Sequence, residues 1–345
     1  MRLKGAALLV ALGLLLGRLP AEGAEAGRGP IPVIDLHVDL AYQQGYEGKS
    51  FATATGQFVA RELLGAGVEG VVLPLFVPRR ASPGGPRIQD LEAAYARVFA
   101  ALATTEPYAL PGCIALPGRT RTWLAFEGAA PLADDPGALA SWVARGVRSV
   151  GLVHTRANAL ASSSGDAAPE PFGLTAKGRA LVRAAHALNV PVDVSHASSR
   201  AVTEIAELSR ASGVPAIATH SNARALADHP RNLSDPELRA IARTGGIVGV
   251  NFHSPFLARG RRARLTDVVR HVRHLVRVMG VEHVAIGSDF EGDIQPPSDL
   301  TSARDLPALA AALEASGLSR DAVERVFAGN AWRVLCRASG LGALR

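Results

Sequence analysis

Short apolar runs alternate with longer segments of helical periodicity along most of the chain. The runs are rich in β-branched residues and nearly continuous, which is typical of strands in a parallel sheet. There are eight of them, at residues 33–37, 68–77, 122–127, 147–154, 190–196, 214–220, 246–252 and 283–289. Helices are predicted between them at 89–103, 175–188, 198–211, 235–243, 265–279 and 304–315.

This alternation predicts an α/β fold with a parallel sheet. Eight strand–helix units fit a closed, TIM-like (β/α)₈ barrel better than an open sheet, and no G-x-G-x-x-G turn follows the first strand. Segment 319–340 is expected to add one or two C-terminal helices. Because there is no internal repeat, and no linker apart from the Pro/Gly-rich loop 78–87, residues 27–345 are predicted to form one domain.

The first 26 residues are set apart from this domain. Arg2 and Lys4 precede an apolar run, 6–16, that is too short to span a bilayer comfortably, and small residues follow at 24–26. The pattern predicts a cleaved signal peptide and an exported protein, periplasmic or extracellular, without a membrane span after cleavage. An uncleaved N-terminal anchor is the alternative.

Composition and charge change this picture little. The formal net charge is +6, but no basic cluster is interleaved with aromatic residues, so nucleic-acid binding is not expected. The densest basic segment, 259–274, is predicted to open a solvated amphipathic helix. Its buried stripe would be Val268, Val269, Val272, Leu275 and Val276. Cys113 and Cys336 form no disulfide framework, although they could pair in an oxidising compartment.

Titratable side chains occur at the ends of six of the eight predicted strands. Because the carboxyl ends of barrel strands meet at one mouth, these side chains should converge. Taken alone, each could be a structural residue whose hydrogen-bonding groups are paired within the fold, and Asp289 could cap a helix. Their common placement favours one shared site. The strand-end residues are His37 with Asp39, Glu127, His154, His196, His220 and Asp289.

Imidazoles and carboxylates without thiolates suit zinc, manganese or cobalt, and their number is too high for a single metal. Lys49 and Lys177 lie in loop and helix-start positions, so a carbamylated lysine is not expected to bridge two metals, and Glu127 is the carboxylate placed to do so. Two such metals can activate a shared water. One would be held by His37, Asp39 and Glu127, and the other by Glu127, His196 and His220.

Two of the converging residues remain outside this predicted ligand set. His154 could stabilise the oxyanion of a hydrolytic reaction, and Asp289 could carry a proton from the attacking water to the leaving amine. The arrangement therefore predicts a hydrolase.

Three longer segments carry a more specific pattern. They are 173–198, 215–235 and 274–292, and the second contains the run HSNARALADHPRNL. They resemble the membrane dipeptidase (renal dipeptidase) family of binuclear zinc peptidases, from about residue 33 to residue 336. The resemblance implies two zinc ions per chain, a dipeptide substrate, often with a D-residue at the C-terminal position, and a homodimer.

The resemblance also implies roles for individual residues. It gives the same five metal ligands, places His154 on the oxyanion side, and makes Asp289 the proton-handling aspartate. It adds Arg231 as the arginine that grips the free carboxylate of the substrate, a contact for which a guanidinium is suited. The usual acidic FDG of the family reads Phe290-Glu291-Gly292 in this chain.

Two other functions remain open from the sequence. Another binuclear barrel amidohydrolase, acting on N-acyl amino acids, lactones or phosphoesters, would use the same metals. A catalytically silent barrel that binds peptides is the alternative outside the enzymes. Arg231 discriminates a dipeptidase from a lactonase or a phosphoesterase, because only a substrate with a free carboxylate needs it.

Overall fold

The computed structural model describes residues 29–166 and 172–337. The predicted signal peptide and the extreme C-terminus lie outside the described residues. Among the described helices, none combines the length and the apolar character needed to cross a bilayer.

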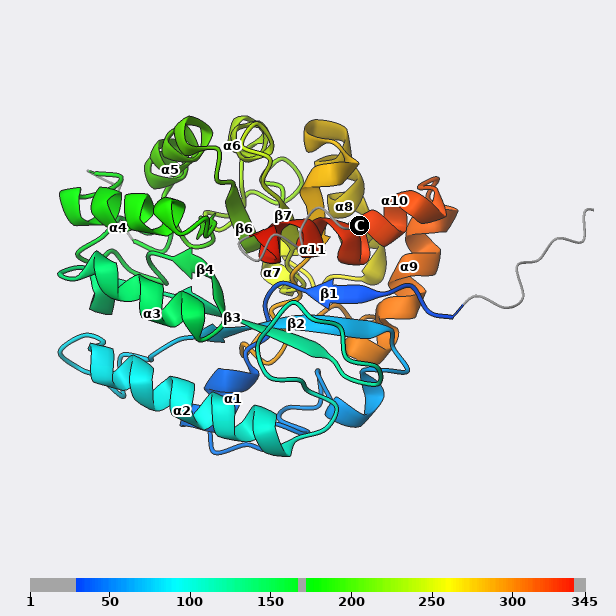
Figure 1. The fold of residues 1–345 in the computed structure, drawn as a ribbon. Coiled ribbons are helices and arrows are strands. Elements are labelled where there is room, and N and C mark those ends of the chain that lie inside the picture. The colour runs from blue at the N-terminus through cyan, green and yellow to red at the C-terminus, as the bar shows by residue number, and fades with distance from the viewer. Residues whose placement is uncertain (1–28, 167–171, 338–345) are drawn as a thin grey trace, which may run out of the picture.

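All eight apolar runs form strands of one closed parallel barrel, which confirms the predicted fold (Figure 1). The strands follow one another in sequence order, and the ring closes where Asp35 of the first strand pairs with Ile286 of the last. The strands are β1 (Val33–Asp35), β2 (Val68–Leu75), β3 (Arg121–Glu127), β4 (Val147–Gly151), β5 (Val192–Asp193), β6 (Ala216–Ser221), β7 (Val248–Val250) and β8 (Val284–Ile286).

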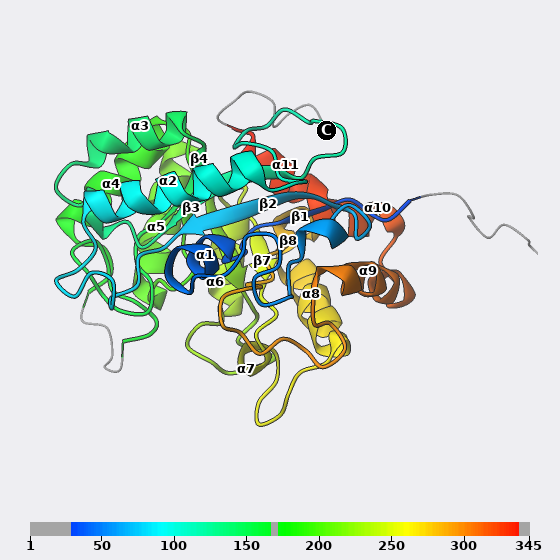
Figure 2. The ribbon, with the colours of Figure 1, turned by 90° about the horizontal axis from the view of Figure 1, so that it is seen from below.

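Helices surround the barrel and connect its strands (Figure 2). The six predicted helices are confirmed as α2 (Ile88–Thr104), α4 (Ala176–Ala187), α5 (Ser199–Ser212), α6 (Asp235–Ala242), α8 (Leu265–Met279) and α9 (Leu306–Ala315). The predicted C-terminal segment forms α10 (Arg320–Glu324), a π-helical turn (Arg325–Gly329) and α11 (Asn330–Leu335). Three short helices were not predicted: α1 (Leu40–Tyr46), α3 (Leu139–Ala144) and α7 (Ser254–Leu257).

Helix α8 differs from its prediction in the residues that it buries. Val268, Val272 and Leu275 are buried as expected, whereas Val269 and Val276 are only half-buried. Two histidines, His271 and His274, are buried instead, and both have hydrogen-bonding partners, including Leu257 O and the Asp235 carboxylate. Burial of these polar rings is tolerated because their ring nitrogens are paired.

Several strands end earlier than the apolar runs do. Of the titratable residues expected at strand ends, only Glu127 and His220 lie within strands, while the others lie in the loops that follow. Two buried aspartates explain part of this difference. Asp35 Oδ1 accepts the backbone N–H of His37 at 3.1 Å, and Asp193 Oδ1 accepts that of Ser195 at 2.9 Å. These local bonds replace ladder hydrogen bonds and turn the chain into a loop.

The C-terminal helices close the amino end of the barrel, opposite the strand ends that carry the titratable residues (Figure 1). The Trp332 ring packs edge-on against Trp123 inside the barrel, with the Arg121 guanidinium 4.4 Å from its ring centroid. A disulfide between Cys113 and Cys336 joins the end of α11 to the loop before β3. The sequence had left open whether these two cysteines pair.

Trp332→Ala should therefore destabilise the fold without altering the mouth of the barrel. Removing a buried tryptophan leaves a cavity, so we expect the free energy of unfolding to fall by about 3–5 kcal/mol. Urea unfolding measures this change, and Leu116→Ala is the control because Leu116 is 50% exposed. Unchanged stability in Trp332→Ala would show that α11 does not contribute to barrel closure.

Candidate metal centre and active site

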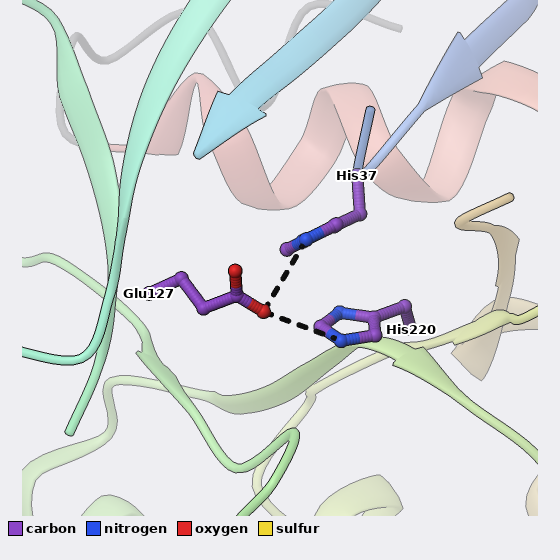
Figure 3. A group of neighbouring side chains, drawn as sticks. All are labelled: His37, Glu127 and His220. Carbon is purple, nitrogen blue, oxygen red and sulfur yellow. Dashed lines mark ion pairs between the residues drawn. The ribbon is translucent and has the colours of Figure 1, made fainter. Parts of the chain in front are cut away.

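The Glu127 carboxylate lies at the centre of a cluster of imidazoles at the carboxyl ends of the strands. Its Oε1 atom is 3.5 Å from His37 Nε2, 3.1 Å from His196 Nε2 and 3.6 Å from His220 Nε2. His154 Nε2 is slightly farther away, at 3.9 Å. Figure 3 shows Glu127, His37 and His220 pointing toward one another from three different strands or strand ends. Residues far apart in the sequence thus converge as predicted.

The nitrogen atoms of this cluster have the environment of unsatisfied ligands. His37 Nε2 is buried and has no hydrogen-bond partner among the described residues, although Asp39 Oδ2 lies 3.6 Å away. His196 Nε2 and His220 Nε2 are 2.9 Å apart and point at each other. Lone pairs of several imidazoles and a carboxylate that converge on one space fit a divalent metal ion.

Within residues 29–166 and 172–337, three groups of side chains have ligand atoms close enough to share a metal. They are His37 with Glu127 and His220, Glu127 with His154 and His196, and His37 with Asp39 and Asp289. All seven predicted residues belong to at least one group. The groups do not divide along the two predicted ligand sets, because they place His154 and Asp289 within reach of a metal as well.

Crowding of carboxyl groups strongly affects their protonation. Burial raises the pKa of Asp39 well above its ordinary value, and the neighbouring charges of Glu127 and Asp289 raise it further. Burial also raises the pKa of Glu127. For Asp289, burial and the Glu127 charge raise the pKa to about 7. Burial of Asp39 and Glu127 and partial burial of Asp289 thus favour the protonated forms of these carboxyl groups, and a bound cation would favour the ionised forms.

The pKa values of the imidazoles shift in the opposite direction, below the ordinary value of histidine. Burial lowers the pKa of His37 to about 4 and holds the pKa values of His196 and His220 well below the ordinary range, with Arg231 contributing in each case. The rings are accordingly neutral near pH 7, which is the form that binds metal.

Two of the site residues have left-handed backbone conformations. His196 has φ of 66° and Asp289 has φ of 65°. Such conformations are unfavourable for residues with a Cβ and persist where the surroundings fix them. Asp289 is fixed by its N–H bond to His37 O at 3.0 Å and by the Asn251 amide, which donates to Asp289 Oδ2 at 2.8 Å. No described helix begins after Asp289 until residue 303, so it is not a helix cap.

A cavity of about 300 Å³ opens over the cluster. Asp39, Glu127, His154, His196 and Asp289 contribute to its walls, as does the predicted carboxylate-binding Arg231. The Arg231 side chain donates to His220 O at 3.2 Å and lies over the Phe256 ring, at 5.6 Å from the centroid. It therefore places a positive charge in the same cavity as the cluster.

The sequence analysis missed several residues of the site. Asn251 follows β7, and it would have been found if amides had been counted with the titratable residues at strand ends. The cavity rim of Tyr42, Phe76, His253 and Phe256 carries no comparable signal, because these residues lie in loops and in two short helices that have no periodic pattern.

Zinc binding to the metal-free protein should release protons. Because the Asp289 carboxyl, with a pKa of about 7, is partly protonated near neutral pH, zinc must displace that proton, and the apparent zinc affinity should fall as the pH decreases below about 7. Calorimetry in two buffers of different ionisation enthalpy measures the release. Asp289→Asn keeps all five proposed ligands, removes a carboxyl group with a pKa of about 7 and should release fewer protons. Proton-free, pH-independent binding would contradict this account of the charges.

Comparison with known proteins bears on the identity of this site. A family profile described as membrane dipeptidase (peptidase family M19) matches residues 28–342. An uncharacterized protein in the pqqA 5′ region of Klebsiella pneumoniae is 41% identical over 221 residues, which are 61% of this chain and 79% of that protein. Dipeptidase tcpJ of Claviceps purpurea is 32% identical over 228 residues, 66% of this chain. The match spans about half, 53%, of the fungal protein.

Solved structures of similar fold also include dipeptidases and metallopeptidases. Dipeptidase AC, a metallopeptidase, superposes with a TM-score of 0.78 at 27% identity, over 90% of this chain and 100% of that chain. A Rhodobacter sphaeroides metallopeptidase, solved with a phosphinate mimic of the dipeptide L-Ala-D-Ala, superposes with a TM-score of 0.77 at 26% identity, over 90% of this chain and 99% of that chain. Together with the profile match over most of its length, the barrel and its cluster identify this chain as a member of the membrane dipeptidase family.

Proposed function

We propose that the protein is a zinc-dependent dipeptidase with membrane dipeptidase activity, which hydrolyses dipeptides with a free C-terminal carboxylate, including L-D dipeptides. The observation that carries this proposal is that one cavity holds both the metal-capable cluster and Arg231. A volume of about 300 Å³ suits a small ligand. The mimic of L-Ala-D-Ala bound by the Rhodobacter sphaeroides relative supports the inclusion of L-D dipeptides among the substrates.

The proposed ligands are those of the sequence prediction. His37, Asp39 and Glu127 would hold one zinc ion, Glu127, His196 and His220 would hold the other, and Glu127 would bridge the two. Zinc bound there would lower the pKa of a water molecule and polarise the carbonyl group under attack. The neutral imidazoles and the unpaired His37 Nε2 support this assignment.

Arg231 would orient the substrate. Its guanidinium, half-buried beside Phe256, can form two hydrogen bonds with a terminal carboxylate. The bond from Arg231 to His220 O fixes the distance between this charge and the cluster. A substrate gripped at its carboxylate would then present its peptide bond at one place.

Asp289 and His154 would act on the reacting atoms. The charge of zinc bound nearby would favour the ionised form of Asp289, and a carboxylate there is suited to take a proton from the attacking water and to return it to the leaving nitrogen. Asp289 is held for that transfer by the Asn251 amide at Oδ2 and by a side-chain hydrogen bond with Asp39. His154 is neutral because burial lowers its pKa, and its partly exposed ring can donate a hydrogen bond to the developing oxyanion.

Three further expectations belong to this proposal. Residues 1–26 would be a signal peptide and the mature protein would be exported, as the basic and apolar pattern of that segment indicates. Residues 27–345 would form a single domain, which the profile match over residues 28–342 supports. A homodimer is proposed from the family resemblance alone.

The substrate assignment is tested with Arg231→Ala and Arg231→Lys. Losing charge-assisted hydrogen bonds worth about 1.5–3 kcal/mol should lower kcat/KM for free-acid dipeptides by about 10–150-fold. Lysine keeps the charge without the paired bonds and should lose less activity. The measurement is hydrolysis of L-L and L-D dipeptides and of their C-terminal amides, with metal content determined for each variant.

The amides separate the proposal from its rival. We expect wild-type protein with two bound zinc ions to cleave the free acids and to leave the amides largely intact. Equal cleavage of acids and amides would retain the metal site but would place the protein among other amidohydrolases. Stoichiometric zinc without any amide hydrolysis would indicate a barrel that only binds peptides.

Asp289→Asn should separate proton transfer from metal binding. The amide cannot carry a proton between water and the leaving nitrogen, so we expect turnover to fall by about 10²–10⁴-fold while both zinc ions remain bound. His196→Ala is the contrasting variant, which should lose one zinc ion. Turnover near that of wild type in Asp289→Asn would remove Asp289 from this role.

A further inference from the structure

A single threonine hydroxyl lies beneath the metal-capable cluster and contacts two of its histidines. Thr219, on β6, is fully buried. Its Oγ1 atom is 3.2 Å from His37 Nδ1 and 2.9 Å from His220 Nδ1. The contacts are made by the ring nitrogens that face away from Glu127, since both Nε2 atoms lie toward that carboxylate.

The direction of these hydrogen bonds follows from Asp193, a buried aspartate at the end of β5. Its Oδ1 accepts the backbone N–H groups of Ser195 and Thr219, at 2.9 and 3.0 Å. Its Oδ2 lies 2.5 Å from Thr219 Oγ1. Because a carboxylate can only accept, the single hydroxyl proton of Thr219 is donated to Asp193.

The two imidazoles must then be the donors. A hydroxyl group has two lone pairs besides its one proton, and these accept from Nδ1–H of His37 and of His220. The Ser195 hydroxyl is also near, but at 3.4 Å it makes the longest of the four contacts. Both rings are thereby held in the tautomer that leaves the Nε2 lone pair free.

We infer that Asp193 and Thr219 are positioning residues that prepare one histidine of each zinc position through a single shared hydroxyl. The inference rests on the proposed function, in which His37 and His220 bind different zinc ions. Hydrogen bonds to the second nitrogen of a ligand histidine fix its tautomer and orientation, and their loss weakens metal binding. His196 has no such support among the described residues, because its Nδ1 is buried without a partner.

Thr219→Val tests the hydroxyl at nearly constant shape. It should weaken the binding of both zinc equivalents together, each by about 10–100-fold, whereas Thr219→Ser should stay within a few-fold of wild type. Competition with a chromophoric zinc chelator measures both affinities. Thr122→Val is the matched control, because Thr122 is a fully buried strand threonine whose hydroxyl bonds to Ala109 O, at 2.8 Å, and to no other of the described residues.

A second variant tests the direction of the bonds and does not require Thr219 to change. In Asp193→Asn, the amide oxygen should remain where Oδ1 receives two N–H groups, so the NH₂ group would face Thr219 Oγ1. The hydroxyl would then accept from the amide and keep one lone pair for a single imidazole. We expect one zinc equivalent to be weakened more than the other, and ¹⁵N NMR of the metal-free protein to show a changed histidine tautomer.

The outcomes separate this inference from the proposed function. Wild-type protein that does not bind two zinc ions or hydrolyse dipeptides would overturn the proposed function, and with it this inference. Wild-type protein that does both, while Thr219→Val binds zinc normally or loses only one equivalent, would overturn the inference alone. If Thr219→Ser or Thr122→Val bound zinc as weakly as Thr219→Val does, the loss of affinity would come from altered packing and not from the hydroxyl. That result would also overturn the inference.

Discussion

Neutralisation of buried carboxylates is the constraint on which this structure depends. Asp39, Glu127 and Asp289 lie close together at the mouth of the barrel, where burial and the charge of Glu127 disfavour the ionised forms of both aspartates. In a flexible chain such groups would separate or turn to solvent. The barrel prevents this, because its hydrogen-bonded strands fix the positions from which they project. The site is therefore built to hold positive charge, and Arg231 supplies part of it permanently.

The barrel could be predicted from the sequence because its strands are short, apolar and separated by long amphipathic helices. Each of the eight runs produced a strand, and each of the six long helices began and ended within two residues of its prediction. The short helices α1, α3 and α7 could not be predicted, since helices of seven, six and four residues are not stable by themselves. They form because the surrounding fold packs against them.

The convergence of the site residues could also be predicted, because barrel geometry brings the strand ends together. The supporting network could not. Asp193 appeared as one polar residue inside an apolar run, and Thr219 as an ordinary strand residue. Their roles depend on hydrogen bonds between β5, β6 and the loop after β1, which neighbour one another only after the ring has closed. The left-handed backbone of His196 and Asp289 likewise has no signature in their residue types.

Ring closure also has a consequence for how the chain reaches its native state. The last strand, β8, pairs with the first, and α11 covers the amino end of the barrel only after nearly all of the described chain is present. Contacts between the beginning and the end of a chain form slowly, because a large loop must be closed before they stabilise anything. Until residue 286 has been synthesised, β1 lacks one of its two neighbours. Throughout that interval its open edge can pair with other chains, so the protein should be most prone to aggregation before it is complete.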